Sequence, residues 1–285
     1  MENKLIKSPM NYIGGKYKLL PQILPLFPKN INTFVDMFCG GLNVGINVRA
    51  NKIIANDYNH FIIDIFKEFK EKSKEEVLKH IEGRIKEYKL SKTNEEGFIK
   101  FREFYNNNKT PLDLYTLVCF SYNYQYRFNN KLDYNNPFGR NRSQFSEELK
   151  KKLEIFLDEL KEKDIKITCQ DYINFYDYEY EKDDFVYCDP PYLITTGSYN
   201  DGNRGFKNWG EKEEKELLEF LDNLNSLNVK FALSNVLEHK GLENNILKEW
   251  TKKYNIHYLN YNYNNCNYHS KNKNYKTIEV LITNY

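Results

Sequence analysis

Short hydrophobic stretches alternate with polar segments along this chain, and some of them have the length and flanking turn residues of buried strands. They lie at residues 33–38, 52–59, 165–172, 184–192, 229–236, 256–263 and 276–285. Between the second and the third stretch, residues 60–105 and 146–163 carry apolar side chains at helical spacing. The pattern therefore predicts an α/β protein whose strands form two groups, separated by a mostly helical insert.

The two groups of strands predict a split domain. We expect residues 1–60 and 165–285 to form one domain together, and residues 61–164 to form the insert. With 40% hydrophobic and 29% charged residues, the composition is that of a globular protein. The chain has no apolar run of about 18 residues, and its start lacks the apolar core of a signal peptide. We therefore expect a cytoplasmic protein without a membrane span.

The first two predicted strands surround a glycine turn. The stretch "TFVDMF" leads into Gly40 and Gly41, "LNVGINVRA" predicts the start of a helix, and the second strand ends near Asp57. This order is typical of a nucleotide-binding βαβ unit, in which the terminal acid accepts hydrogen bonds from ribose hydroxyls. The turn lacks the full G-x-G-x-x-G pattern, so a dinucleotide is disfavoured. An ordinary tight turn is the alternative interpretation.

A second glycine turn, "NYIGGK", lies near the N-terminus and presents Lys16 close to Tyr12. Glycine lets the backbone approach a ligand closely. A cation and an aromatic ring at such a turn can face a ligand's carboxylate and its neighbourhood. A solvent-exposed turn is the alternative for this stretch taken alone.

The stretch "FVYCDPPY" ends a predicted buried strand on an acid, two prolines and a tyrosine. The prolines fix the backbone, so Asp189, Pro190, Pro191 and Tyr192 form a rigid loop. Such a loop suits an exocyclic amine such as adenine N6, whose lone pair is delocalised into the ring. The Asp189 carboxylate and the Pro190 carbonyl can accept its two N–H groups, and the Tyr192 ring can stack on the base. A simple turn after a strand is the alternative.

Taken in order, "NYIGGK", "FVDMFCGG", "ANDYN", "CQDY" and "YCDPPY" resemble the motifs of the Dam-like, DPPY-type DNA adenine-N6 methyltransferases of the α group. The resemblance implies a Rossmann-like seven-strand methyltransferase sheet, S-adenosylmethionine as methyl donor and S-adenosylhomocysteine as product. It also implies that the target adenine is flipped out of the duplex. Met37 and Leu42 stand where the family frequently has proline and glycine. The residues that match its cofactor motifs are Tyr12, Lys16, Asp36, Phe38, Gly40, Asp57, Asp171, Tyr172 and Asp189.

Within the insert, residues 119–145 are polar, aromatic and rich in turn residues, and "LDYNN" predicts the turn of a hairpin. Four basic side chains of this segment stand against one acid, whereas the whole chain has a net charge of only +2. A nucleic-acid site must therefore be a local patch. The segment resembles the family's recognition hairpin, and a solvated polar loop is the alternative. The candidates for DNA contact are Arg127, Asn129, Asn130, Lys131, Arg140 and Arg142.

A second basic stretch, residues 267–276, is expected either to follow DNA phosphates or to form a flexible loop. The five cysteines and five histidines lack the spacing of a zinc site or a disulfide framework, so no metal is expected. The resemblance implies double-stranded DNA as partner, in a bacterial, archaeal or phage context. A cognate restriction endonuclease acting separately is compatible with it, and a monomer is favoured over a dimer. The recognition sequence, GATC or another adenine-containing site, cannot be derived from these residues.

Three alternative functions remain open at this point. The nearest is an amino-methyltransferase acting on cytosine N4, RNA or protein glutamine, and Asp rather than Asn or Ser in the loop favours adenine over these. A catalytically silent DNA-binding module is disfavoured because Asp189 and Lys16 are both present. A nucleotide-dependent oxidoreductase is disfavoured by the incomplete glycine pattern.

Overall fold

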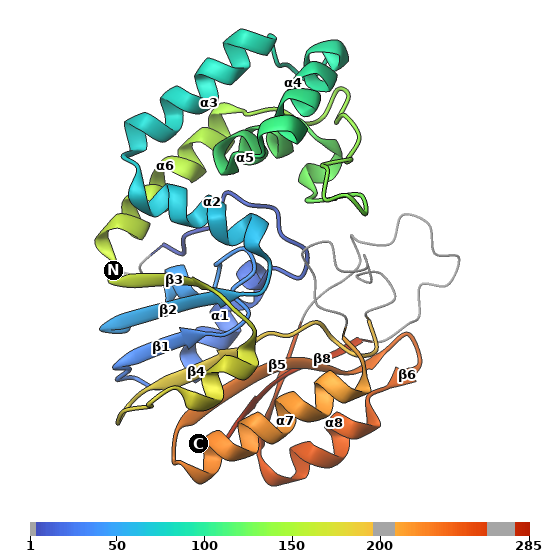
Figure 1. Ribbon diagram of the computed structural model, residues 1–285. Helices are drawn as coiled ribbons and strands as arrows, with labels where there is room; N and C mark the ends of the chain where they lie inside the picture. Colours follow the sequence, from blue (N-terminus) through green and yellow to red (C-terminus); the bar gives the residue numbers. More distant parts are fainter. Residues whose placement is uncertain (1–3, 196–208, 261–276) are drawn as a thin grey trace.

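The computed structural model describes residues 4–195, 209–260 and 277–285, and its centre is a single mixed β-sheet (Figure 1). The strand order is β3-β2-β1-β4-β5-β8-β7, with the short β6 paired to β5. Strands β3, β2, β1, β4 and β5 run parallel, whereas β8 is antiparallel to both β5 and β7. The strands are β1 Thr33–Asp36, β2 Lys52–Asp57, β3 Ile165–Cys169, β4 Phe185–Cys188, β5 Lys230–His239, β6 Leu242–Glu243, β7 Asn255–Leu259 and β8 Thr277–Thr283.

Each predicted strand stretch contains a strand of this sheet, so the α/β class and the Rossmann-like sheet are confirmed. Neighbouring side chains of the central strands enter opposite cores. On β1, Phe34 packs in the cluster that includes helix α1, and Val35 packs in the cluster that includes α7 and α8. Parallel strands covered on both faces are continuous apolar runs, which is why the sequence pattern located them.

The predicted helix at "LNVGINVRA" was wrong, because this stretch forms turns and one short 3₁₀ segment, Gly45–Asn47. The Asn47 side chain donates to the carbonyl of Asn43 at 2.8 Å, which is the acceptor that a regular helix would use for a backbone bond. Leu42 adopts a left-handed conformation with φ of 58°, at the position where the family frequently has glycine. Val48 then returns to extended backbone.

Helices account for most of the insert, and their ends follow capping rules. The predicted helical region 60–105 is divided where Ser73 and Asn94 accept hydrogen bonds from backbone N–H groups of the next helix. Helix α5, which the pattern had not separated, begins at Pro111. No helix in the described ranges is long and apolar enough to cross a membrane. The α-helices are α1 Leu20–Ile23, α2 His60–Glu71, α3 Lys74–Tyr88, α4 Glu95–Asn108, α5 Pro111–Cys119, α6 Glu147–Glu162, α7 Glu211–Ser226 and α8 Asn245–Trp250.

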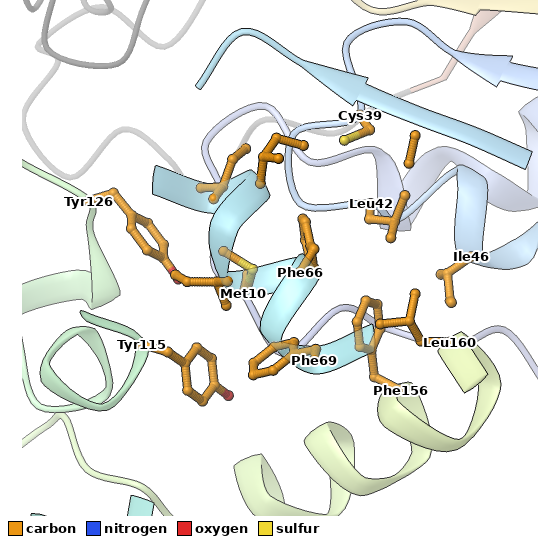
Figure 2. Close-up of a cluster of buried hydrophobic side chains, with 14 of the residues drawn as sticks. Met10, Cys39, Leu42, Ile46, Phe66, Phe69, Tyr115, Tyr126, Phe156 and Leu160 are labelled. Carbon is orange, nitrogen blue, oxygen red and sulfur yellow. The ribbon is translucent and has the colours of Figure 1, made fainter. Parts of the chain in front are cut away.

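Helix α2 joins the insert to the sheet through a shared core. Figure 2 shows Phe66 and Phe69 of α2 in one cluster with Tyr115 of α5 and Phe156 of α6. The same buried cluster includes Leu42 beside the glycine turn. The helices of the insert and one face of the sheet therefore share the same hydrophobic core.

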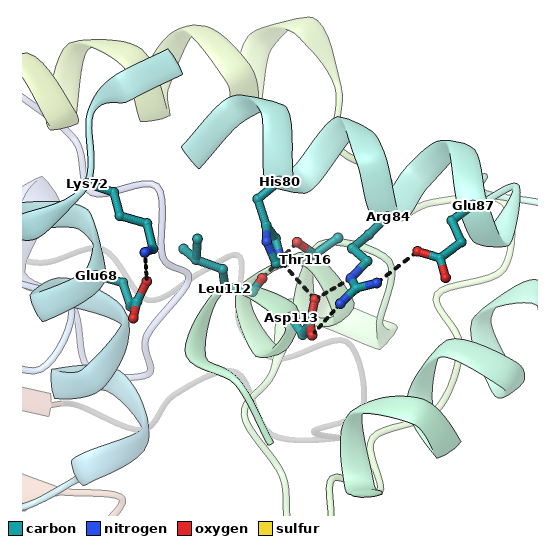
Figure 3. A network of polar contacts seen from close by, with 8 residues as sticks. All are labelled: Glu68, Lys72, His80, Arg84, Glu87, Leu112, Asp113 and Thr116. Carbon is teal, nitrogen blue, oxygen red and sulfur yellow. Dashed lines mark hydrogen bonds and ion pairs between the residues drawn. The ribbon is translucent and has the colours of Figure 1, made fainter. Parts of the chain in front are cut away.

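A buried ion network fixes α3 to α5 (Figure 3). The carboxylate of Asp113 is fully buried and accepts from His80 Nε2 at 2.7 Å and from Arg84 Nε at 2.8 Å. Burial alone would raise the pKa of Asp113, but the hydrogen bonds from His80 and Arg84 lower it to about 2. Asp113 therefore stays ionised among the helices of the insert, where these partners, together with Thr110, offset its burial.

Candidate active site

One pocket opens at the carboxyl ends of β1, β2 and β4. In the strand order, β1 lies between β2 and β4. From β1 the chain continues outward to β2 and β3 on one side, and it later returns to add β4 and β5 on the other side. Ligands of open α/β sheets bind at such a switch point. All of the residues predicted for cofactor binding or catalysis line this pocket, namely Tyr12, Lys16, Asp36, Phe38, Gly40, Asp57, Asp171, Tyr172, Asp189, Pro190, Pro191 and Tyr192.

The glycine turn after β1 is closed by Asp57 from β2. The Asp57 carboxylate accepts from the backbone N–H of Gly40 and from that of Asn59, both at 2.9 Å. Gly40 has φ of +47°, and a Cβ there would lie 2.9 Å from a ring carbon of Tyr12. Only glycine fits this position without strain. The turn thus brings the backbone, the Tyr12 ring and the acid to one wall of the pocket.

Asp36 is a buried acid without a cationic partner in the described part of the chain. Its Oδ2 accepts from the Gly45 N–H at 3.0 Å, whereas its buried Oδ1 has no hydrogen-bond partner among the described residues. Burial raises the pKa of Asp36 to about 8, and burial also raises that of Asp57 to about 6. Asp36 is therefore mostly protonated at neutral pH, and an orphaned oxygen in a pocket fits a cationic ligand group.

Lys16 pairs with Asp189, the acid of the proline loop. Its Nζ lies 2.8 Å from Asp189 Oδ1, and the Tyr192 hydroxyl donates to the same oxygen at 2.9 Å. Burial raises the pKa of Asp189, and the charge and hydrogen bond of Lys16 oppose that rise. Lys16 also lies 5.0 Å from the centre of the Tyr192 ring. The sequence analysis interpreted Lys16 as a cation that faces a ligand's carboxylate, and it did not predict the ion pair with Asp189.

A second acid, Glu279 on β8, also lies within ion-pair distance of Lys16. Its Oε1 lies 3.9 Å from Lys16 Nζ, and its side chain is buried. No sequence motif pointed to Glu279, because it is one polar residue within the apolar stretch of the last strand. Lys16 is therefore held between two carboxylates.

Aromatic side chains form another wall of the pocket. The Phe38 ring lies 5.5 Å from that of Tyr172 and 5.8 Å from that of Trp209, measured between ring centroids. The neighbouring Asp171 caps the segment Tyr172–Asp177 by accepting from the Ile173 N–H. Trp209 was missed by the sequence analysis because no recognised motif contains it.

The predicted hairpin has antiparallel arms, but its turn lies earlier than expected. Phe128 pairs with Tyr134, and Ser121 pairs with Phe138. The reversal occurs over residues 129–132, because the Asn129 side chain accepts from the backbone N–H groups of residues 131 and 133. Most of "LDYNN" consequently belongs to the returning arm.

The DNA-contact candidates lie around this hairpin, and all of them except the half-buried Asn129 are exposed. The Arg142 guanidinium stacks over the Tyr122 ring at 5.1 Å, and Arg140 pairs with Glu95 of α4. The hairpin also contacts the N-terminal motif, since Asn11 Nδ2 donates to the Asn123 carbonyl at 2.9 Å. The segment that carries the basic residues is therefore tied to the segment that carries Lys16. The basic stretch at residues 267–276 lies outside the described residues.

Comparison with known proteins identifies the family. The chain is 60% identical over 283 residues to the Type II methyltransferase M.FokI of Planomicrobium okeanokoites, which covers 99% of this chain and 43% of that protein. It is 56% identical over 285 residues to the modification methylase StsI of Streptococcus sanguinis, with 99% and 43% covered. It is 28% identical over 198 residues to the DNA adenine methylase of Escherichia coli (strain K12), with 67% and 66% covered.

The chain spans less than half the length of the first two of these relatives. The family described as D12 class N6 adenine-specific DNA methyltransferase matches residues 12–265, which include every residue that lines the pocket. The resemblance found in the sequence motifs is therefore confirmed, and the chain belongs to the D12 class N6 adenine-specific DNA methyltransferases.

Proposed function

We propose that this chain transfers a methyl group from S-adenosylmethionine to N6 of adenine in double-stranded DNA. The observation that carries this proposal is the ion pair between Lys16 and Asp189 within a pocket that also holds Pro190 and Tyr192. These groups supply a fixed acceptor, a rigid loop and an aromatic ring at the point where a base must react.

Three features of the pocket fit S-adenosylmethionine. The orphaned oxygen of Asp36 suits the ligand's ammonium group, and Asp57 suits its ribose hydroxyls. The Phe38, Tyr172 and Trp209 rings suit its adenine. When bound, S-adenosylmethionine supplies an electrophilic methyl group on a sulfonium.

The proline loop acts on the target amine. Both described donors to Asp189 use Oδ1, which leaves Oδ2 to accept one N6–H, while the Pro190 carbonyl accepts the other. These bonds favour the tetrahedral amine, whose lone pair attacks the methyl carbon as the carbon–sulfur bond breaks. The charge and the hydrogen bond of Lys16 oppose the rise in the pKa of Asp189 that burial causes, which favours the carboxylate form that accepts. After transfer the cationic amine loses one N6 proton to water. Stacking on the Tyr192 ring contributes about 1–3 kcal/mol to holding the flipped base.

The insert binds the DNA in this proposal. Within residues 119–145, the side chains of Arg127, Lys131 and Arg142 are exposed, and Lys131 and Arg142 lie in turns. In the major groove, arginine can bind guanine and Asn130 can bind adenine. Asn130 can alternatively contact a phosphate of the DNA backbone. The contact between Asn11 and Asn123 links this surface to the pocket, so base recognition and base capture occur on connected segments.

The names of the relatives support a modification role. The StsI protein, which is called a modification methylase, shares 56% identity with this chain. We infer that the protein methylates sites that a separately acting restriction endonuclease would otherwise cut, in the cytoplasm of a prokaryotic or phage-infected cell, as a monomer.

Labelled methyl transfer tests the reaction. Unmethylated plasmid DNA is incubated with methyl-labelled S-adenosylmethionine, and the digested nucleosides are separated. We expect label in N6-methyladenine with the wild-type protein and with the exposed-acid control Asp177→Asn, but none with Asp189→Ala. Label in N4-methylcytosine, or in no nucleoside, would overturn the proposal.

A further inference from the structure

Trp209 stands in the aromatic wall of the pocket, and its orientation is set by one hydrogen bond. The indole Nε1 donates to Glu214 Oε2 at 2.9 Å. The ring then meets Phe38 edge-on, at an interplanar angle of 85°, and lies 6.1 Å from the Tyr172 ring. Trp209 precedes Gly210, the N-cap of α7, and Glu214 lies in the first turn of that helix. These positions, N′ and N4, often carry a hydrophobic staple, and here a hydrogen bond joins them.

Glu214 is a buried acid whose hydrogen-bond partners, Trp209, Asn235 and Asn244, are all neutral. Only 1% of its side chain is exposed, and its Oε1 accepts from Asn235 at 3.1 Å and from Asn244 at 2.9 Å. Burial raises the pKa of Glu214, while the three side-chain hydrogen bonds oppose the rise. A buried carboxylate is costly, and an apolar side chain would fill this space at lower cost. Asn235 belongs to β5 and Asn244 caps α8, so Glu214 ties Trp209 to two fixed elements.

We propose that Glu214 is a positioning residue for the cofactor pocket, which holds the Trp209 indole as a wall for the adenine of S-adenosylmethionine. The inference rests on the proposed cofactor. A glutamine at position 214 keeps the volume and can still accept from the two asparagines. Its amide NH₂ would then face the indole N–H, donor against donor, and Trp209 would lose its anchor.

The chain provides a matched control on the same helix. Trp250 donates its indole N–H to Asp222 Oδ1 of α7, also at 2.9 Å, and stacks on Phe231 away from the pocket. These are the two tryptophans of the sequence. Asp222 also accepts from Tyr254 and pairs with Lys253, so Asp222→Asn alters the acceptor of a tryptophan that does not line the pocket.

The test is equilibrium dialysis of labelled S-adenosylmethionine, with kcat and KM from the methylation assay. We expect Glu214→Gln to raise Kd and KM about tenfold, with kcat changed less than about twofold, and Asp222→Asn to leave Kd unchanged. In a Trp209→Phe background, which has no indole donor, Glu214→Gln should cause little further loss.

Two results would overturn the inference, and a third would overturn the function instead. Equal Kd values for wild type and Glu214→Gln would refute the positioning role. So would a full additional loss in the Trp209→Phe background, because that would assign Glu214 a general structural role. Failure of the wild-type protein to bind S-adenosylmethionine would refute the proposed function itself, and the tryptophan emission of Glu214→Gln without ligand would still report whether Trp209 had moved.

Discussion

Replacing Asp36 with asparagine removes the negative charge of this side chain and keeps its size and shape. Asp36 is buried beside the glycine turn, with a pKa raised to about 8 by burial and then by the charges of Asp189 and Asp57. In the empty pocket it is mostly protonated at pH 7. A cationic ammonium group favours the carboxylate form, so binding S-adenosylmethionine must release a proton from Asp36 whenever the pH is below about 8.

The magnitude follows from the pKa. Below about pH 8, each unit of acidification makes the deprotonated form about tenfold rarer, so cofactor affinity should rise about tenfold between pH 6 and pH 7. Near pH 8 the rise should level off, because Asp36 is then half ionised and the ligand's own amine, with an ordinary pKa of about 8, loses its charge. Asp36→Asn should bind more weakly at pH 8 and should lose this slope.

The same substitution has an opposite effect on folding. Because the folded-state pKa of Asp36 is raised above its unfolded value of 3.8, deprotonation favours the unfolded chain, and stability falls as the pH rises toward about 8. An asparagine cannot deprotonate, so the ligand-free variant should melt at the same or a higher temperature than wild type at pH 8. A weaker binder that is no less stable cannot be explained by misfolding.

Isothermal titration of S-adenosylmethionine at pH 6, 7 and 8, in buffers of different ionisation enthalpy, measures both the affinity and the proton released. A wild-type affinity that is constant between pH 6 and pH 7, or a variant that keeps the wild-type slope and proton release, would refute the assigned role of Asp36.

Three further predictions address other parts of the molecule. Lys16→Met should raise the pKa of the catalytic carboxylate, so the acidic limb of the kcat profile should move to higher pH, and an unmoved limb would contradict the ion-pair role. Arg84→Met should lower the free energy of unfolding in urea by about 3–5 kcal/mol because it leaves the buried Asp113 with one partner fewer, whereas Lys100→Met, at an exposed ion pair, should cause no measurable change. Arg142→Ala should weaken binding to DNA in fluorescence anisotropy about tenfold while leaving the Kd of S-adenosylmethionine unchanged, and a loss of cofactor binding would show that the variant disturbs the pocket.

The strands could be predicted from the sequence because burial on both faces makes each one a continuous apolar run, as in "FVYC" of β4. Side chains that bond to their own backbone were harder to predict. Asn47 takes the carbonyl that a helix would have used, and Asn129 moves the hairpin turn toward the N-terminus. Both are local competitions between a polar side chain and regular structure, and hydrophobic periodicity carries no information about them.

The pocket residues could be predicted where they belong to recognised motifs, but their partners could not. Lys16 and Asp189 are far apart in the chain: Lys16 begins the 3₁₀ segment Lys16–Leu19 ahead of β1, Asp189 follows β4, and only the packing of the N-terminal segment against the sheet brings them together. Trp209 and Glu214 lie outside every motif and depend on the start of α7. Contacts of this kind are set by the three-dimensional arrangement of elements, which a single sequence does not specify residue by residue.

Three of the motif acids that line the pocket, Asp36, Asp57 and Asp189, differ in their surroundings, and the difference follows their proposed roles. Asp189 must accept a hydrogen bond from the target amine as a carboxylate, and it is the one paired with a lysine. Asp36 and Asp57 have no such partner in the described part of the chain, and although burial raises the pKa of all three acids, a lysine opposes the rise at Asp189. Asp36, whose charge is disfavoured when no ligand is bound, regains it when a cationic ligand arrives, so the binding energy of that ligand grows with its positive charge. S-adenosylhomocysteine lacks the sulfonium charge. The pocket should therefore bind this product more weakly than it binds S-adenosylmethionine, which favours product release.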